Sequence, residues 1–391
     1  MKKLSSTVRS LIASSLGLPG MQELLAQEPP DEGISYLFNY YDEEPLPADK
    51  LAFGSPERYT IYSQQLRWVK NLDESYSLTV ELLHEGMSGS SPWYVMPDPV
   101  AGPLQVMSGA TIRENRNQAD VALSRRGNGF THTAALGYST EDDYRAVYGR
   151  YSGEKESADG LSTIAWGLSY SDDDLEPTDA ALFGRVESAT RDSFSVSTSF
   201  TQVLNRNALL QTGVTLTSQS GYLSDPYKLV WVGETVLSDS RPDRRVMWTW
   251  TTRFRQYMER SKAALHIDYR YLTDDWSVRT STLDLAWHQP AGENWEITPA
   301  LRYYTQTAAD FYGPIFSTTP GDGYWSSDFR LATYGALSYR LDGVMRKEKW
   351  SLSLAAEYYN SARHLALSGT PQDTPALVDF WRFTASCTVN L

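Results

Sequence analysis

The chain has 391 residues, with 35 basic and 48 acidic side chains and a formal net charge of −13. An apolar content of 41% excludes a disordered chain, and the acidic balance excludes the clustered basic surface of a nucleic-acid-binding protein. No apolar run is long enough for a transmembrane helix. The single cysteine, Cys387, excludes a disulfide scaffold and a multi-thiolate metal site.

The N-terminus has the composition of a secretory signal peptide. Lys2, Lys3 and Arg9 precede a modestly apolar stretch over residues 11–25, and Ala26 is the expected cleavage position. A short amphipathic helix on a soluble domain is the alternative interpretation. If residues 1–26 are a signal peptide, residues 27–391 form one domain that folds outside the cytoplasm.

From residue 33 onward, apolar and polar residues alternate with a period of two, which is typical of strands with one apolar face. In the segment 262–273, for example, Leu265, Ile267 and Tyr269 share one face, and His266 and Asp268 lie on the other. The pattern predicts strands near 33–41, 57–70, 76–88, 116–126, 129–139, 142–154, 160–172, 189–202, 207–219, 245–258, 262–273, 277–288, 294–308, 328–341, 348–361 and 379–390.

The connections between these segments differ in length in a regular way. Connections after even-numbered strands are short, whereas most of those after odd-numbered strands are long. This asymmetry predicts an all-β fold, a transmembrane antiparallel up-and-down β-barrel of about 16 strands (roughly 14–18), with short periplasmic turns and long extracellular loops. A soluble sandwich or jelly roll also alternates. An apolar face on every strand favours the membrane barrel, because lipid is then needed outside and water inside.

Several segments of the chain also resemble a known bacterial family. They are Ser220 to Lys228 (SGYLSDPYK), Arg302 to Tyr312 (RYYTQTAADFY) and Ser326 to Leu331 (SSDFRL). They are similar to segments of an uncharacterised family of predicted Gram-negative outer-membrane β-barrels, and the resemblance covers nearly the whole mature chain. It implies the barrel fold and no particular substrate.

Strand parity places charged side chains of both signs on the inner face of the predicted barrel. We expect a wet lumen in which these residues contact a solute, although they could instead pair with one another and serve only stability. Arg253, Arg255, Arg270 and Arg302 could form a basic stretch of wall. The candidate lumen residues are Arg67, Glu81, Arg253, Arg255, Asp268, Arg270, Asp284 and Arg302.

The long loops carry aromatic and charged residues that we expect to fold inward over the lumen, with loops 89–115, 220–244 and 309–327 forming the mouth. The candidate mouth residues are Trp93, Tyr94, Tyr222, Asp225, Tyr227, Lys228, Asp310, Phe311 and Tyr312. Asp172, Asp173 and Asp174 are weak candidates for a metal site, because their spacing matches no known calcium loop. We expect no cofactor, and no catalytic motif is present.

The sequence therefore favours an outer-membrane barrel that passes or binds a small polar solute. One alternative is a membrane-embedded hydrolase that uses the rim residues Asp142, Asp143, Asp274 and Asp275. Another is a structural or assembly barrel that docks a periplasmic partner. The expected partners are outer-membrane lipid, lipopolysaccharide and the barrel-assembly machinery, and no nucleic acid is expected.

Overall fold

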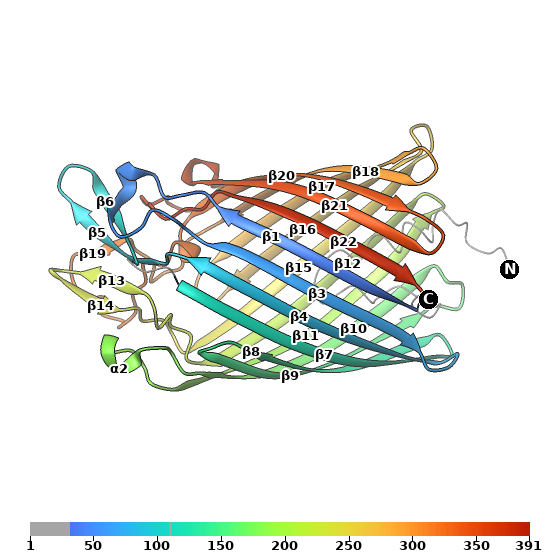
Figure 1. The fold of residues 1–391 in the computed structure, drawn as a ribbon, viewed down its shortest axis with the longest axis horizontal. Coiled ribbons are helices and arrows are strands. Elements are labelled where there is room, and N and C mark those ends of the chain that lie inside the picture. The colour runs from blue at the N-terminus through green and yellow to red at the C-terminus, as the bar shows by residue number, and fades with distance from the viewer. Residues whose placement is uncertain (1–31, 109–111) are drawn as a thin grey trace.

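The fold was analysed in a computed structural model, which describes residues 32–108 and 112–391. The predicted signal peptide and its cleavage position lie outside the described residues. Sixteen strands form a closed barrel in which every neighbouring pair is antiparallel (Figure 1). The predicted fold and strand number are confirmed.

In chain order, the barrel strands are β1 (Gly33–Glu43), β3 (Thr60–Asn71), β4 (Tyr76–Gly89), β7 (Ile112–Gly127), β8 (Phe130–Thr140), β9 (Tyr144–Glu156), β10 (Ser162–Leu175), β11 (Ala189–Asn205), β12 (Ala208–Gly221), β15 (Arg244–Met258), β16 (Ala263–Asp274), β17 (Arg279–Ala291), β18 (Trp295–Gln306), β20 (Tyr334–Arg346), β21 (Trp350–Ala362) and β22 (Phe380–Asn390).

The barrel closes where its first and last strands meet. Strand β1 pairs with β22 along its whole length, from Gly33 opposite Asn390 to Glu43 opposite Phe380, and with β3 on its other side. Each barrel strand therefore has two hydrogen-bonded neighbours. This arrangement leaves no open sheet edge, as a sheet that crosses lipid requires.

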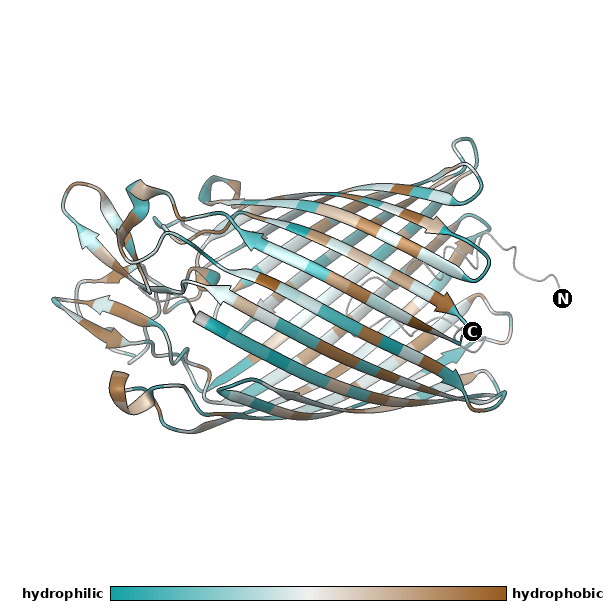
Figure 2. Ribbon diagram, in the orientation of Figure 1, coloured by the Kyte–Doolittle hydropathy of each residue, from teal (hydrophilic) through white to brown (hydrophobic). Residues whose placement is uncertain are grey.

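The two faces of the barrel wall differ in chemistry. Large apolar side chains stay exposed on the outer face, such as Leu136 at 72% and Val147 at 60%. The cross-strand register places serine, threonine and charged side chains on the inner face, for instance Ser195 beside Thr217. Figure 2 shows the resulting alternation of hydrophobic and hydrophilic residues along the strands. A face of exposed apolar residues is stable against lipid, and the inner face is suited to water.

The two ends of the barrel are unequal. Tight turns and the C-terminus lie at one end, and long loops with secondary structure of their own extend from the other (Figure 1). We call these the turn end and the loop end. The loop-end elements are η1 (Ala48–Lys50), β2 (Leu51–Phe53), β5 (Pro92–Asp98), β6 (Gly102–Met107), α2 (Ala180–Phe183), β13 (Leu229–Val232), β14 (Thr235–Ser238), β19 (Ile315–Phe316), η2 (Phe329–Leu331) and η3 (Arg363–Leu365).

Helices contribute little to the described part of the chain. Across residues 32–108 and 112–391, none has the length and hydropathy needed to span a bilayer.

One predicted strand begins in the wrong place. The sequence pattern predicts a strand over 328–341, but β20 begins at Tyr334 and residues 329–331 form the 3₁₀ turn η2. The side chain of Asp328 accepts a hydrogen bond from the backbone nitrogen of Arg330, and this N-terminal cap stabilises the turn. Arg330 therefore belongs to a loop and is not part of a strand.

Candidate functional site

Six charged side chains from two long loops meet above the loop end of the barrel. Asp225, Lys228, Asp239 and Arg241 come from the connection between β12 and β15, and Asp328 and Arg330 come from the connection between β18 and β20. We call these six residues the loop ion network. Three cations and three anions balance, so the network carries no formal net charge.

Arginine side chains hold this network together. Arg241 lies 2.7 Å from Asp239 and 2.9 Å from Asp328, measured from guanidinium nitrogen to carboxylate oxygen. Arg330 lies 2.6 Å from Asp328 and 2.8 Å from Asp225. Two of the segments that carry the family resemblance, Ser220 to Lys228 and Ser326 to Leu331, are thus joined by a direct ion pair between Asp225 and Arg330.

Burial shapes the protonation of the network. Burial would raise the pKa of Asp328, but the charges on Arg330 and Lys228 outweigh it and hold that pKa below its ordinary value. Burial raises the pKa of Asp239, against the opposing charge of Arg241. Burial also lowers the pKa of Lys228, although Asp328 and Asp225 oppose this shift. The negative charge of Asp328 is therefore more strongly stabilised than that of Asp239.

The loop ion network also contacts a third loop. The ammonium group of Lys228 donates a 2.5 Å hydrogen bond to the carbonyl oxygen of Pro92, in the connection between β4 and β7. Strands β13 and β19 pair in parallel, with Trp231 opposite Ile315. The three loops predicted to form the mouth are therefore bonded to one another, through Lys228 in one case and through backbone pairing in the other.

An apolar cluster anchors the connection between β18 and β20 to the barrel. Trp276, Phe311, Tyr312 and Leu331 pack together there, with the rings of Trp276 and Phe311 5.0 Å apart edge to face. Inward-facing Gln306 donates hydrogen bonds of 3.0 Å to the carbonyl oxygen of Arg330 and 2.5 Å to that of Ala332. Turn η2 is thereby held against the inner wall at the top of the lumen.

The predicted mouth residues have separate local roles. Trp93 lies edge-on to the rings of Tyr94 and Phe183, at 5.9 and 6.4 Å between centroids. Ser277 donates a 2.5 Å hydrogen bond to Asp310. The hydroxyl of Tyr227 donates to Asp143, and Tyr222 is half-buried near Asp239 and Asp225. Of the nine, only Asp225 and Lys228 belong to the loop ion network.

Most of the predicted lumen residues form ion pairs across neighbouring strands. Arg67 lies 3.3 Å from Glu81, and Arg302 lies 2.5 Å from Asp284. Arg255 pairs with Asp268. The side chain of Arg302 nevertheless keeps 44% of its surface accessible, so pairing has not closed the lumen at this point.

The predicted basic wall of four arginines is only partly realised. Arg255 and Arg302 are neutralised by their partners, and Arg253 is 3% exposed beneath other side chains, where it bonds to Gln211. Arg270 is different because its side chain is exposed to the lumen. Within the described chain, no hydrogen bond or ion pair joins it to another residue. Arg270 is therefore the accessible unpaired cation of this stretch of wall.

The weak metal candidates do not converge on one point. Asp173 faces inward and pairs with Arg191 at 2.7 Å, whereas Asp172 and Asp174 lie on the opposite face of β10. In the described residues, the carboxylates that do gather are those of Glu114, Glu141 and Asp143, whose oxygens lie within 4.8 Å of one another. Three carboxylates at this spacing could hold a divalent cation.

The rim residues of the alternative hydrolase do not form a shared site. The side chain of Asp274 pairs with Arg245 at 2.5 Å, and Asp275 accepts a 2.9 Å hydrogen bond from the backbone of Val246. Asp142 and Asp143 belong to the connection between β8 and β9, whereas Asp274 ends β16 and Asp275 begins the connection between β16 and β17. Six strands separate these connections around the barrel, so the four carboxylates serve two different parts of the rim.

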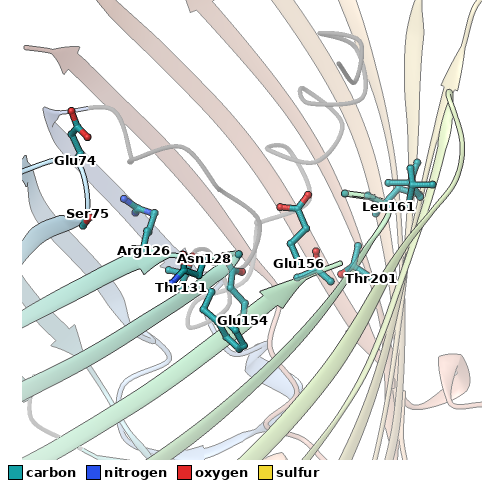
Figure 3. A pocket seen from close by; sticks show the side chains of 16 residues that line it. Glu74, Ser75, Arg126, Asn128, Thr131, Glu154, Glu156, Leu161 and Thr201 are labelled. Atoms are coloured by element: carbon teal, nitrogen blue, oxygen red, sulfur yellow. The ribbon is translucent and has the colours of Figure 1, made fainter. Parts of the chain in front are cut away.

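A cavity of about 390 Å³ lies inside the turn end of the barrel (Figure 3). Its lining includes Glu74, Glu154 and Glu156 together with Arg126. A second cavity, of about 250 Å³, lies at the loop end and is lined by Arg245, Arg270 and Arg330. The lumen thus has an acidic lining at one end and a basic lining at the other. Sequence parity alone does not reveal this difference, because Arg330 belongs to a loop.

Comparison with known proteins adds a family and a fold. The family described as "Protein of unknown function (DUF3570)" matches residues 8–376. Comparison with curated protein sequences gives no match.

Among solved structures, CdiB from Acinetobacter baumannii is similar with a TM-score of 0.50 and 8% identity, over 91% of this chain and 60% of that one. A bacterial polysaccharide outer membrane secretin has a TM-score of 0.49 and 8% identity, over 93% and 99% of the two chains. The siderophore receptor PirA from Pseudomonas aeruginosa has a TM-score of 0.43 and 10% identity, over 85% of this chain and 56% of its own length. These neighbours are outer-membrane barrels, and at such low identity the likeness concerns the fold alone.

Proposed function

The chain belongs to the family of proteins of unknown function DUF3570, and we propose that it is an outer-membrane channel or binding barrel for a small polar solute. The observation that carries this proposal is the accessible polar wall inside a closed barrel. Ion-paired side chains on the inner face keep much of their surface free, with Arg302 44% exposed and Arg382 37% exposed. Barrels of sixteen or more strands are wide enough for an aqueous channel.

The composition of the lumen fits a polar solute better than an apolar one. Hydroxyl side chains line β10, β11 and β12, where Ser169 faces Ser195 and Ser195 faces Thr217 across the strands. Arginine and carboxylate pairs line β16, β17 and β18. A solute that makes hydrogen bonds can exchange water for these groups at little cost, whereas an apolar solute would leave them unsatisfied.

The proposal includes export of the chain through the signal peptide expected over residues 1–26 and insertion in the outer membrane. Tight turns would then face the periplasm, and the loop ion network would face the outside. Edman sequencing of the protein purified from outer membranes tests the first step. A mature N-terminus at Gln27 is the expected result, and an intact Met1 would contradict it.

Conductance in planar lipid bilayers tests the channel. We expect discrete current steps from the purified barrel, together with swelling of liposomes in small neutral sugars. A matched preparation of heat-unfolded protein controls for leak through damaged lipid. A barrel that inserts and stays silent in both assays would contradict passage of a solute.

A further inference from the structure

The cavity at the loop end is lined by the barrel wall and by turn η2. Its wall consists of two cross-strand rows on β16, β17 and β18. The deeper row contains Arg270, Thr282 and Tyr304, and the upper row contains Leu272, Thr280 and Gln306. Side chains directly opposite one another on neighbouring strands lie about 5 Å apart at their Cβ atoms, so each row can contact one small ligand.

Turn η2 forms the roof of this cavity. Arg330 and Leu331 line it from above, and Gln306 holds their backbone in place with the two hydrogen bonds described above. The hydroxyl of Tyr304 donates a 2.5 Å hydrogen bond to Gln306 and so fixes the amide in the orientation that supports the roof. Hydrogen bonds therefore tie the wall of the cavity to its roof.

The charge of the lining is positive once existing pairs are counted. Arg245 is neutralised by Asp274, and Arg330 by Asp328 and Asp225. Arg270 has no such partner in residues 32–108 and 112–391. The hydroxyls of Thr280 and Thr282 also make no side-chain hydrogen bond within that part of the chain. One guanidinium and two hydroxyl donors thus point at the same space without an acceptor.

We propose that this cavity binds an oxyanion, a carboxylate or phosphate group of a small solute, with Arg270 as the principal ligand and Thr282 and Thr280 as further donors. The guanidinium fork matches a planar or tetrahedral oxyanion through two parallel hydrogen bonds. A volume of about 250 Å³ lies below the range of about 300–1,000 Å³ typical of ligand pockets, which suits a small solute or one charged group of a larger one. The acidic cavity at the turn end offers such a group no second site.

This inference rests on the proposed function, because a solute site in the lumen matters only if the barrel passes or binds a solute. Its test measures binding and does not require the barrel to conduct. Isothermal titration of the detergent-solubilised barrel uses gluconate, inorganic phosphate and glucose as probes. Gluconate carries a carboxylate on a skeleton of the same length as neutral glucose, and phosphate distinguishes the free inorganic ion from an organic acid. We expect saturable binding of gluconate, phosphate or both, and none of glucose.

Variants then locate the binding. Arg270→Gln should weaken it about tenfold or more, since a charge-assisted bond is lost. Arg270→Lys should recover part of the loss, and Thr282→Val should weaken it less than Arg270→Gln. Arg340 is also an inward-facing arginine, and it pairs with Asp342. It lies on β20 four residues closer to the turn end than Ala336, the residue opposite Tyr304 of the deeper row. Arg340→Gln is therefore the matched control. It removes the same charge and should leave the affinity within twofold.

The outcomes separate the two proposals. Wild-type protein that conducts but binds neither anion overturns the oxyanion site and leaves the channel. Equal loss in Arg270→Gln and Arg340→Gln also overturns the site, because the effect would then be general lumen charge. Specific binding by a barrel that never conducts supports the site and contradicts passage. Retained mobility of the folded band on unheated gels verifies that each variant has folded.

Discussion

Arg241 is the cation on which two buried carboxylates of the loop ion network depend. Its own side chain is 10% exposed, and the side chains of Asp239 and Asp328 are 0% and 1% exposed. Arg241→Met would leave both carboxylates short of their shared partner. Breaking a buried pair in this way costs about 3–5 kcal/mol, and the loss should fall on the loops because the barrel ladder is untouched.

Limited proteolysis of the folded barrel measures this effect. The variant should be cut within residues 222–243 and 307–333 much faster than the wild type, while the barrel core stays resistant. Arg206→Met is the control, because Arg206 pairs with Glu259 at an exposed turn where such pairs are worth about 0–1 kcal/mol. Equal protection of wild type and Arg241→Met would show that the network does not order the loops.

Asp328 sets the pH range over which the loop ion network holds. Its pKa in the folded protein lies below the ordinary value of 3.8, so its contribution is complete above 3.8 and is lost as the pH falls through the folded value. Loop protection from hydrogen exchange should therefore be level from neutral pH to about 4 and should decline in stronger acid. Asp328→Asn should already show weak protection at neutral pH. If loop protection in the wild type declined around pH 6 instead, a group other than Asp328 would control the stability of the network.

At the scale of a strand, the alternation of β12 makes a sharp prediction about which side chains meet water. The register puts Thr215 and Thr217 on the inner face and Leu216 between them on the outer face. In a Cys387→Ser background, cysteine at 215 or 217 should react with a charged, membrane-impermeant thiol reagent in liposomes. Cysteine at 216 should be protected by lipid. Reaction at 216 together with protection at 217 would show that the inner and outer faces of β12 are assigned the wrong way round.

Strand periodicity predicted the barrel well because each strand obeys a local rule. The alternation of β16 from Leu265 to Tyr271 needs only lipid on one side and water on the other, so it is visible without knowledge of the neighbours. Loop structure follows no such rule. Asp328 and Arg330 alternate in polarity as strand residues do, yet ion pairs to Arg241 and Asp225 hold them in a turn. Contacts across about 100 residues of sequence decided that outcome.

The same difference explains the candidate site. Parity correctly placed Arg270 and Arg302 on the inner wall, because the side-chain direction is a property of one strand. Parity could not show that Arg302 would be neutralised by Asp284, nor that Arg253 would be covered. Those facts depend on the register between neighbouring strands. The acidic and basic ends of the lumen are likewise properties of the assembled barrel.

At the scale of the whole molecule, the loops decide how much of the lumen is open. The connection between β18 and β20 spans residues 307–333 and roofs the cavity at the mouth, yet Gln306 and Tyr334 on either side of it are direct partners in the ladder. A short Gly-Ser turn can therefore replace residues 308–332 without straining the barrel. We expect larger single-channel conductance from this variant, and weaker anion binding because the roof above Arg270 is gone.

The connection between β10 and β11 provides the control for that deletion. Leu175 and Ala189 are also direct ladder partners, and the intervening helix α2 buries no residue. Shortening residues 177–187 to a similar turn should change conductance little, because this segment does not line the cavity at the mouth. If both deletions raise conductance equally, loop length alone sets the opening. If the 308–332 deletion leaves conductance unchanged, the opening at the roof is wider than the lumen beneath it. The narrowest point of the channel then lies deeper, among the ion pairs of the inner wall.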